Sequence, residues 1–170
     1  PSTRVPLDEF RRDDMLAVYR LTFAGTAPRP EDMCFQVLPS LDVVEIFTLQ
    51  SSIVETLKNH FPSAMVQGLY GTMLSQVAEM QQGSTLSVST HAIILDGGVM
   101  IAVLRSGRLV FANVFRAVQN ADRLYFILYV WRMLSLDALH DSCTLYGASE
   151  SLYEDICQYL ANVNMRELSV

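Results

Sequence analysis

Three apolar runs separated by two short glycine turns, in the second half of the chain, restrict the fold more than any other feature. Residues 86–95, 99–105 and 108–115 are rich in β-branched and aromatic side chains. Asp96-Gly97-Gly98 separates the first two runs, and Ser106-Gly107 separates the last two. Such turns between apolar runs are typical of β-hairpins. The sequence therefore predicts a three-stranded antiparallel meander.

A helix, a short strand and a second helix are predicted after the meander. The helices cover residues 120–136 and 151–162, and the strand covers residues 143–146. The resulting order, β-β-β-α-β-α, is that of the RNase-H-like unit, which actin-like ATPases use twice. The predicted fold class is therefore α/β, an actin-like ATPase or RNase-H-like fold with a mixed sheet.

The first half of the chain has a different predicted pattern. A helix without any element before it is expected in residues 1–23, followed by strands at 34–38, 43–49 and 64–67 and helices at 51–60 and 69–82. Alternating strands and helices suggest a parallel sheet covered by helices. Gly83 and Ser84 mark the one predicted boundary. It divides the chain into a partial first lobe, residues 1–83, and an RNase-H-like lobe, residues 84–170.

Composition narrows the class of protein. The net charge of the chain is −6, and binding to nucleic-acid phosphates requires a basic surface. We therefore expect no nucleic-acid partner. The longest apolar stretch, residues 124–136, is too short for a membrane span and contains Arg132. Three scattered cysteines without CxxC spacing indicate free thiols in a reducing compartment, hence a cytoplasmic protein. Isolated histidines and cysteines predict no metal site.

Six stretches along nearly the whole chain carry a family resemblance. They are residues 4–7 (RVPL), 38–47 (LPSLDVVEIF), 60–64 (HFPSA), 107–115 (GRLVFANVF), 125–130 (YFILYV) and 145–153 (LYGASESLY). In this order they resemble an uncharacterised family of Bacteroidetes proteins with an actin-like ATPase fold, the domain of unknown function 3822. At the level of fold the chain is also similar to cytoplasmic pilus-assembly and type II secretion proteins of the actin-like class.

The resemblance also implies that this chain corresponds to only part of a family member. Family members carry a further segment before this point, with the first phosphate loop. Since the chain begins at Pro1, we expect it to lack that segment and half of any nucleotide site.

The resemblance implies a nucleotide site made by two turns, with ATP and magnesium as its ligands. Actin-like ATPases place an acidic, glycine-rich phosphate hairpin where this chain has Asp96, Gly97 and Gly98. A glycine turn that faces adenosine corresponds to Gly147-Ala148-Ser149. The alternatives are an ordinary hairpin turn at the first position and, at the second, a strand-to-helix turn with Ser149 as helix cap.

No catalytic constellation is visible in the sequence. The first strand of the meander has no Asp or Glu, so the carboxylates of an RNase-H nuclease are missing, and no Ser/His/Asp motif occurs. No catalytic residue is therefore predicted.

We expect an actin-like module that is non-catalytic or binds nucleotide weakly, and that acts through contact with a protein partner or a second copy. The alternative is an ATPase or sugar-kinase-like phosphotransferase that uses the cleft between the lobes. The aromatic run at residues 124–131 is either a buried central helix or a docking surface.

Overall fold

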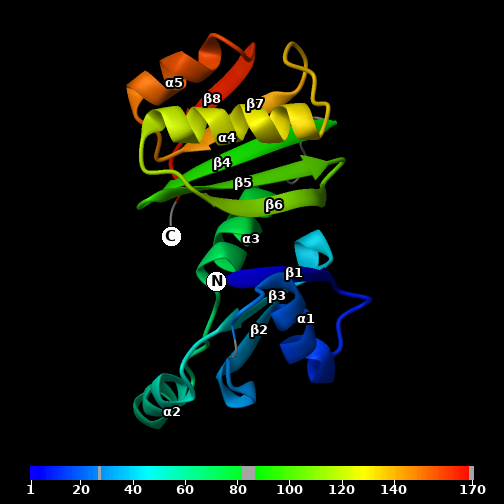
Figure 1. Cartoon of the computed structure of the whole chain (residues 1–170), viewed down its shortest axis with the longest axis vertical. Coiled ribbons are helices and arrows are strands. Elements are labelled where there is room, and N and C mark those ends of the chain that lie inside the picture. Colours follow the sequence, from blue (N-terminus) through cyan, green and yellow to red (C-terminus); the bar gives the residue numbers. More distant parts are fainter. Residues whose placement is uncertain (27, 82–86, 169–170) are drawn as a thin grey trace. The chain divides into compact units, whose positions relative to one another are not determined.

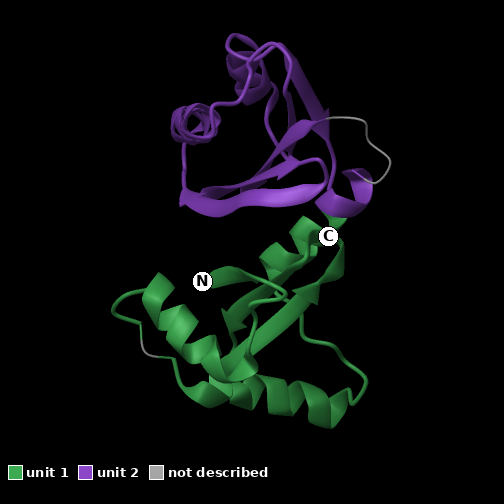
Figure 2. Cartoon of the chain, turned by 90° about the vertical axis from the view of Figure 1, so that its right-hand side faces the viewer, with its two compact units in different colours: residues 1–76 green, residues 77–170 purple. Residues whose placement is uncertain are grey.

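The chain divides into two compact units, residues 1–76 and residues 77–170 (Figure 2). A computed structural model describes residues 1–26, 28–81 and 87–168. The predicted boundary at Gly83 and Ser84 lies outside the described residues. Each unit contains a sheet of its own, so each has a core that can be described by itself.

Unit 1 is built on a three-stranded sheet in the order β1-β3-β2, with both strand pairs antiparallel (Figure 1). Its strands are β1 (Ser2–Pro6), β2 (Met33–Leu38) and β3 (Val43–Thr48), and its helices are α1 (Met15–Thr22), α2 (Ser51–His60) and the start of α3 (Leu69–Gln81). Helix α1 covers one face of the sheet, where Met15 and Tyr19 pack against Ile46. The opposite face of β3 carries Glu45, which is fully buried.

Three predictions for this half of the chain are wrong. The sheet is antiparallel rather than parallel, and strand β1 precedes the first helix because it finds a partner in β3. Residues 64–67 are not a strand, since they have no neighbouring strand and lead the chain to the start of α3. A short apolar run becomes a strand only where a sheet edge is available, and sequence pattern alone does not reveal edges.

Unit 2 is built on a five-stranded mixed sheet in the order β6-β5-β4-β7-β8. Its strands are β4 (Val88–Leu95), β5 (Gly98–Arg105), β6 (Arg108–Arg116), β7 (Ser142–Tyr146) and β8 (Asn162–Arg166), and its helices are α4 (Asn120–Met133) and α5 (Glu150–Cys157). The predicted meander is confirmed, because β4 pairs with β5 and β5 pairs with β6, both in antiparallel orientation. The crossover is confirmed as well, because β7 runs parallel to β4 after α4.

The last predicted helix is too long, because residues 158–161 are not helical and a strand begins at Asn162. Helix α5 ends at Cys157, and Asn162–Arg166 pairs parallel with β7 as β8. Helix α4 also ends earlier than predicted, at Met133, and Ser135 just beyond it has a φ of 53°. Positive φ is incompatible with a continuing right-handed helix. Strand β8, which the sequence did not predict, is the fifth strand and lies at the edge of the sheet.

Helices α4 and α5 both pack on one face of this sheet, where they form the apolar core of unit 2. Ile127, Val130 and Trp131 of α4 are buried there, together with Leu152 and Ile156 of α5. Figure 1 shows α4 running alongside the strands of this sheet. In the described part of the chain, no helix combines the length and apolar character needed to cross a membrane.

Candidate functional site

The two predicted turns lie at the same end of the sheet of unit 2. Strands β4 and β7 are parallel, and Ile93 is opposite Tyr146 in their register. Each turn follows the carboxyl end of its strand. A Cβ atom built on Gly147 would lie 3.7 Å from the carbonyl oxygen of Ile94, which comes two residues before Asp96. This geometry brings both turns to one rim, the arrangement on which the predicted site depends.

The first turn has two glycines with different physical requirements. Gly97 has a φ of 72°, and a Cβ atom there would meet nothing within 4 Å, so only its backbone conformation favours glycine. Gly98 is buried, and a Cβ atom there would lie 2.8 Å from the carbonyl oxygen of Phe115. Close approach of β6 therefore explains Gly98. Asp96 is exposed beside them.

The residues of the second turn lead into helix α5 and cap its start. Gly147 has a φ of 68°, and Ala148 packs against the apolar core. The Ser149 hydroxyl accepts a hydrogen bond from the Leu152 N–H at 3.3 Å and another from Asn120 Nδ2 at 3.0 Å. Ser149 is thus the N-cap of α5, as the structural alternative for this turn predicted.

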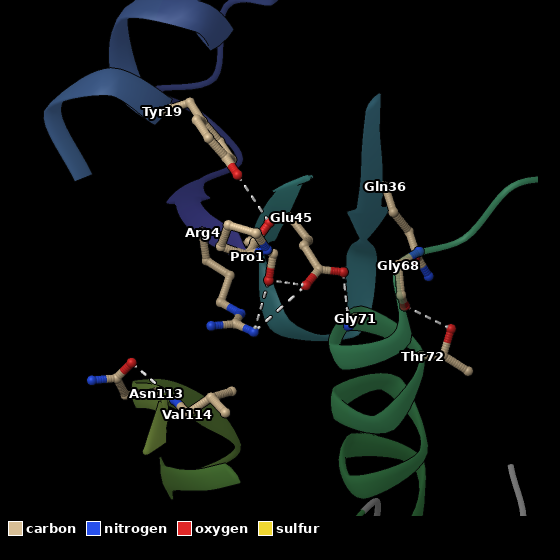
Figure 3. Close-up of polar contacts among 11 residues, drawn as sticks. Pro1, Arg4, Tyr19, Gln36, Glu45, Gly68, Gly71, Thr72, Asn113 and Val114 are labelled. Carbon is tan, nitrogen blue, oxygen red and sulfur yellow. Dashed lines mark hydrogen bonds and ion pairs between the residues drawn. The ribbon is translucent and has the colours of Figure 1, made fainter. Parts of the chain in front are cut away.

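A buried charged network that the sequence reasoning missed lies in unit 1. Arg4, Glu45 and Gln36 are neighbours across β1, β3 and β2 and point to the same face (Figure 3). Glu45 Oε1 accepts a hydrogen bond from Ser2 Oγ at 2.6 Å and lies 3.5 Å from Arg4 Nη2. Burial lowers the pKa of Arg4, while the nearby Glu45 carboxylate and Tyr70 oppose this shift. The guanidinium also lies over the Tyr70 ring, 5.8 Å from its centre.

This network holds the first turn of α3. The Gly71 N–H donates to Glu45 Oε2 at 2.8 Å, and the Gly68 N–H donates to Gln36 Oε1 at 2.9 Å (Figure 3). These are N–H groups that a helix leaves without an internal partner, and a carboxylate is favourable at this end of the helix dipole. A Cβ atom on either glycine would collide with Glu45 Oε2. Both glycines therefore allow the carboxylate to approach the helix closely.

Two sequence signals could have indicated this network. Glu45 is the one charged residue in a mostly apolar strand, and buried carboxylates require partners. Gly68 and Gly71 stand three residues apart at the start of a predicted helix, where glycine is otherwise unfavourable. Both oxygens of Glu45 are occupied by protein groups, so the arrangement anchors a helix and leaves no free carboxylate for chemistry.

Comparison with known proteins identifies the family. The family described as protein of unknown function (DUF3822) matches residues 1–163. The chain belongs to the DUF3822 family. No match was found among curated proteins.

Among solved structures, a Bacteroides thetaiotaomicron VPI-5482 protein with an actin-like ATPase fold and unknown function resembles this DUF3822 chain with a TM-score of 0.82 and 22% identity. The similarity covers 97% of this chain and 64% of that one. The PilM-PilN type IV pilus biogenesis complex gives a TM-score of 0.57 at 11% identity, over 98% of this chain and 65% of that one. This chain thus spans about two thirds of the length of both, and the actin-like fold is confirmed.

An actin-like ATPase fold implies ATP with magnesium, but the rim of this DUF3822 chain fits that ligand poorly. Asp96 is the one carboxylate of the first turn, and Ser149 already uses its hydroxyl as a helix cap. Over residues 1–26, 28–81 and 87–168, no group of three or more His, Cys, Asp and Glu side chains could hold a metal ion. Gly98 approaches protein backbone rather than open space.

Another buried polar network of the DUF3822 chain lies in the sheet of unit 2, and it is neutral. His91 is fully buried, with Nδ1 3.0 Å from the Tyr146 hydroxyl and Nε2 3.0 Å from the Ser89 hydroxyl. Burial lowers the pKa of His91 to about 4, and the positive charge of Arg166 adds to the shift. The imidazole is therefore neutral at physiological pH, with both nitrogens occupied by hydroxyl partners.

Proposed function

We propose that this chain is an interaction module of actin-like fold that binds nucleotide weakly or not at all and acts through protein–protein contact. The observation that carries the proposal is that the residues of the two turns already make contacts within unit 2. Gly98 accommodates the Phe115 carbonyl, Ala148 packs into the core and Ser149 caps α5. Residues engaged in this way are poor candidates for a nucleotide site.

Exposed aromatic side chains support the protein-contact part of the proposal. Tyr125 and Tyr129 of α4 are 61% and 47% exposed, and tyrosine is enriched at the energetic centres of protein interfaces. The PilM-PilN complex gives an example of a similar fold that assembles with a protein. We further propose a cytoplasmic location, which free thiols at Cys34, Cys143 and Cys157 support. The division into lobes 1–83 and 84–170 stays a prediction.

Isothermal titration calorimetry with ATP and magnesium tests the nucleotide part of the proposal. We expect no heat of binding at micromolar nucleotide, because the rim offers few groups that are free to bind phosphate. The experiment is best made on the longest chain that contains this sequence, since the present chain covers 64% of its solved relative. Micromolar affinity together with ATP turnover would contradict the proposal.

The alternative, an ATPase or sugar-kinase-like phosphotransferase, is favoured by one observation, the position of both turns at one rim. In this alternative Asp96 would lie near the metal and Gly147 near adenine. It predicts that Asp96→Asn abolishes hydrolysis and leaves the fold intact, because Asp96 is exposed and its loss creates no cavity. Equal, low background hydrolysis in both proteins would exclude it.

A further inference from the structure

The exposed residues of α4 form one continuous stripe along the helix. They are Ala121, Asp122, Tyr125, Tyr129, Arg132 and Met133. Their spacing of three and four residues places them on one side of the helix. The opposite side contains Ile127, Val130 and Trp131, which are buried in the core of unit 2. The core of unit 2 therefore does not explain why the outer side contains exposed tyrosine and methionine side chains.

The middle of this stripe is aromatic and accessible. Tyr125, Tyr129 and Met133 are 61%, 47% and 45% exposed. The rings of Tyr125 and Tyr129 already stack on one another, with centres 6.1 Å apart and planes 18° from parallel. A preformed pair of rings loses little side-chain entropy when it binds a partner. The stripe thus has the composition and order of an interface rather than of an ordinary solvated face.

The ends of the stripe carry opposite charges. Asp122 lies near the start of α4 and Arg132 near its end, about 15 Å apart at the rise of an α-helix. One Asp122 oxygen accepts a hydrogen bond from the Gln119 N–H at 3.3 Å as part of the capping box of α4, and the side chain is exposed. Arg132 forms no ion pair with any residue that the structure describes. Both charges are available to a partner.

These positions make the stripe complementary to itself. We propose that α4 binds α4 of a second copy of this chain in antiparallel orientation, an inference that rests on the proposed function in protein contact. Asp122 and Arg132 are equally distant from Ile127 along the helix, and so are Tyr125 and Tyr129. An antiparallel pair centred at Ile127 places each aspartate opposite an arginine, and each Tyr125 opposite Tyr129 of the second copy.

Symmetry makes this the favoured partner. A twofold axis produces every contact twice and closes the assembly as a dimer. A parallel pair would instead place Asp122 opposite Asp122 and Arg132 opposite Arg132, where like charges repel. A pair of helices is at the small end of specific interfaces, so we expect a dissociation constant in the micromolar range, roughly 1–100 µM.

Sedimentation velocity over a concentration series tests the dimer. We expect dimers of the wild-type chain and at least a tenfold weaker association of a Tyr125→Ala, Tyr129→Ala double variant. Phe61→Ala is the matched control, because Phe61 is an aromatic residue of unit 1 that is 62% exposed. A wild-type chain that stays monomeric at a concentration on the order of 100 µM would overturn the proposal. So would a dimer that Phe61→Ala dissociates and the tyrosine variant does not.

A charge exchange tests the antiparallel register. Asp122→Arg alone and Arg132→Asp alone should each weaken self-association at least tenfold, because each creates two repulsive pairs in the symmetric dimer. An equimolar mixture of these two variants should associate again, because in the mixed dimer every arginine faces an aspartate. Recovery in the mixture also shows that each variant is folded. Association of either variant alone at the wild-type level, or a mixture that stays monomeric, would contradict the register.

The outcomes separate this inference from the proposed function. A monomeric chain that binds no ATP removes the dimer but leaves the interaction module, whose partner is then a different protein. A dimer that also binds and hydrolyses ATP keeps the inference and removes the proposed function.

Discussion

The two units bury polar groups in opposite ways. In unit 1 a charged carboxylate, Glu45, lies fully buried between Arg4, Ser2 and the first turn of α3. In unit 2 a fully buried histidine, His91, is kept neutral between two hydroxyl groups. A buried charge needs a full set of partners, whereas a neutral imidazole needs two hydrogen bonds.

This difference affects which elements of the fold each network positions. The partners of Glu45 come from strand β1 and from a helix that starts more than twenty residues later, so the charge fixes how these elements meet β3. The partners of His91 come from neighbouring positions of β4 and β7, whose pairing already follows from the apolar pattern. We infer that the charged network specifies the packing of α3 in unit 1, while the neutral one adds to a sheet that is already specified.

The largest expected effect comes from Glu45→Ala. The substitution leaves Arg4, with 11% of its side chain exposed, without its carboxylate and leaves the Gly71 N–H without an acceptor. We expect the free energy of unfolding to fall by about 3–5 kcal/mol in urea titrations followed by circular dichroism. Glu55→Ala on the exposed face of α2 is the control and should change it by less than about 0.5 kcal/mol. Equal effects of the two substitutions would remove the special role of unit 1.

Acid should act on the neutral network of unit 2. The pKa of His91 is about 4 in the folded protein and near 6.5 in the unfolded chain, so below pH 6.5 the unfolded state takes up the proton first. The His91 contribution to stability is present above pH 6.5 and is lost progressively as the pH falls to about 4, by about 3 kcal/mol. Urea titrations at several pH values measure this loss. A His91→Gln variant should show a correspondingly smaller decrease over the same range, and an unchanged decrease would contradict the assignment.

Two glycine substitutions, one in each unit, should have effects of intermediate size on the free energy of unfolding. Gly68→Ala places a methyl group against Glu45 and 3.1 Å from the Phe47 ring, so we expect a loss of about 1–3 kcal/mol from overpacking. Gly97→Ala meets no atom and has only the strain of its φ of 72°, about 1 kcal/mol. Thermal unfolding of both variants measures the difference. In addition, Glu45→Ala should relieve the Gly68→Ala cost, and strict additivity of the two changes would contradict the proposed contact.

The smallest expected effect concerns the rim of unit 2. Ser149→Ala removes the N-cap of α5, so the free energy of unfolding should decrease by about 1 kcal/mol. Ser151→Ala, one residue into the same helix, lacks the capping bond and serves as the control. If Ser149 acts as a cap alone, the heat measured on addition of ATP stays unchanged. A substitution that leaves stability intact but alters nucleotide binding would assign the hydroxyl to a ligand.

The fold of unit 2 could be predicted because its signals are local. Asp96-Gly97 and Ser106-Gly107 mark tight turns, and the runs between them are apolar enough to be strands. Strand β8 was missed because Asn162–Arg166 is mostly exposed and polar, so only its pairing with β7 makes it a strand. The pairing lies in the tertiary structure and has no sequence period of its own.

The sheet of unit 1 was harder to predict because its order depends on contacts distant in sequence. Strand β1 is short and reads as a leading segment until β3 is placed beside it. The network joins residues 4, 45 and 71 through Glu45 and residues 36 and 68 through Gln36, and no local motif connects them. For the candidate site, the sequence predicted that both turns reach one rim, but not that Gly98 accommodates a β6 carbonyl.

Nuclear magnetic resonance of the 15N-labelled chain tests the central claim most directly, because it follows the rim and α4 in one sample. We predict that dilution shifts the backbone amides of Tyr125 and Tyr129, while addition of ATP with magnesium leaves those of Gly97 and Gly147 unchanged. Saturable shifts of Gly97 and Gly147 at micromolar nucleotide, with α4 unaffected by dilution, would contradict the account.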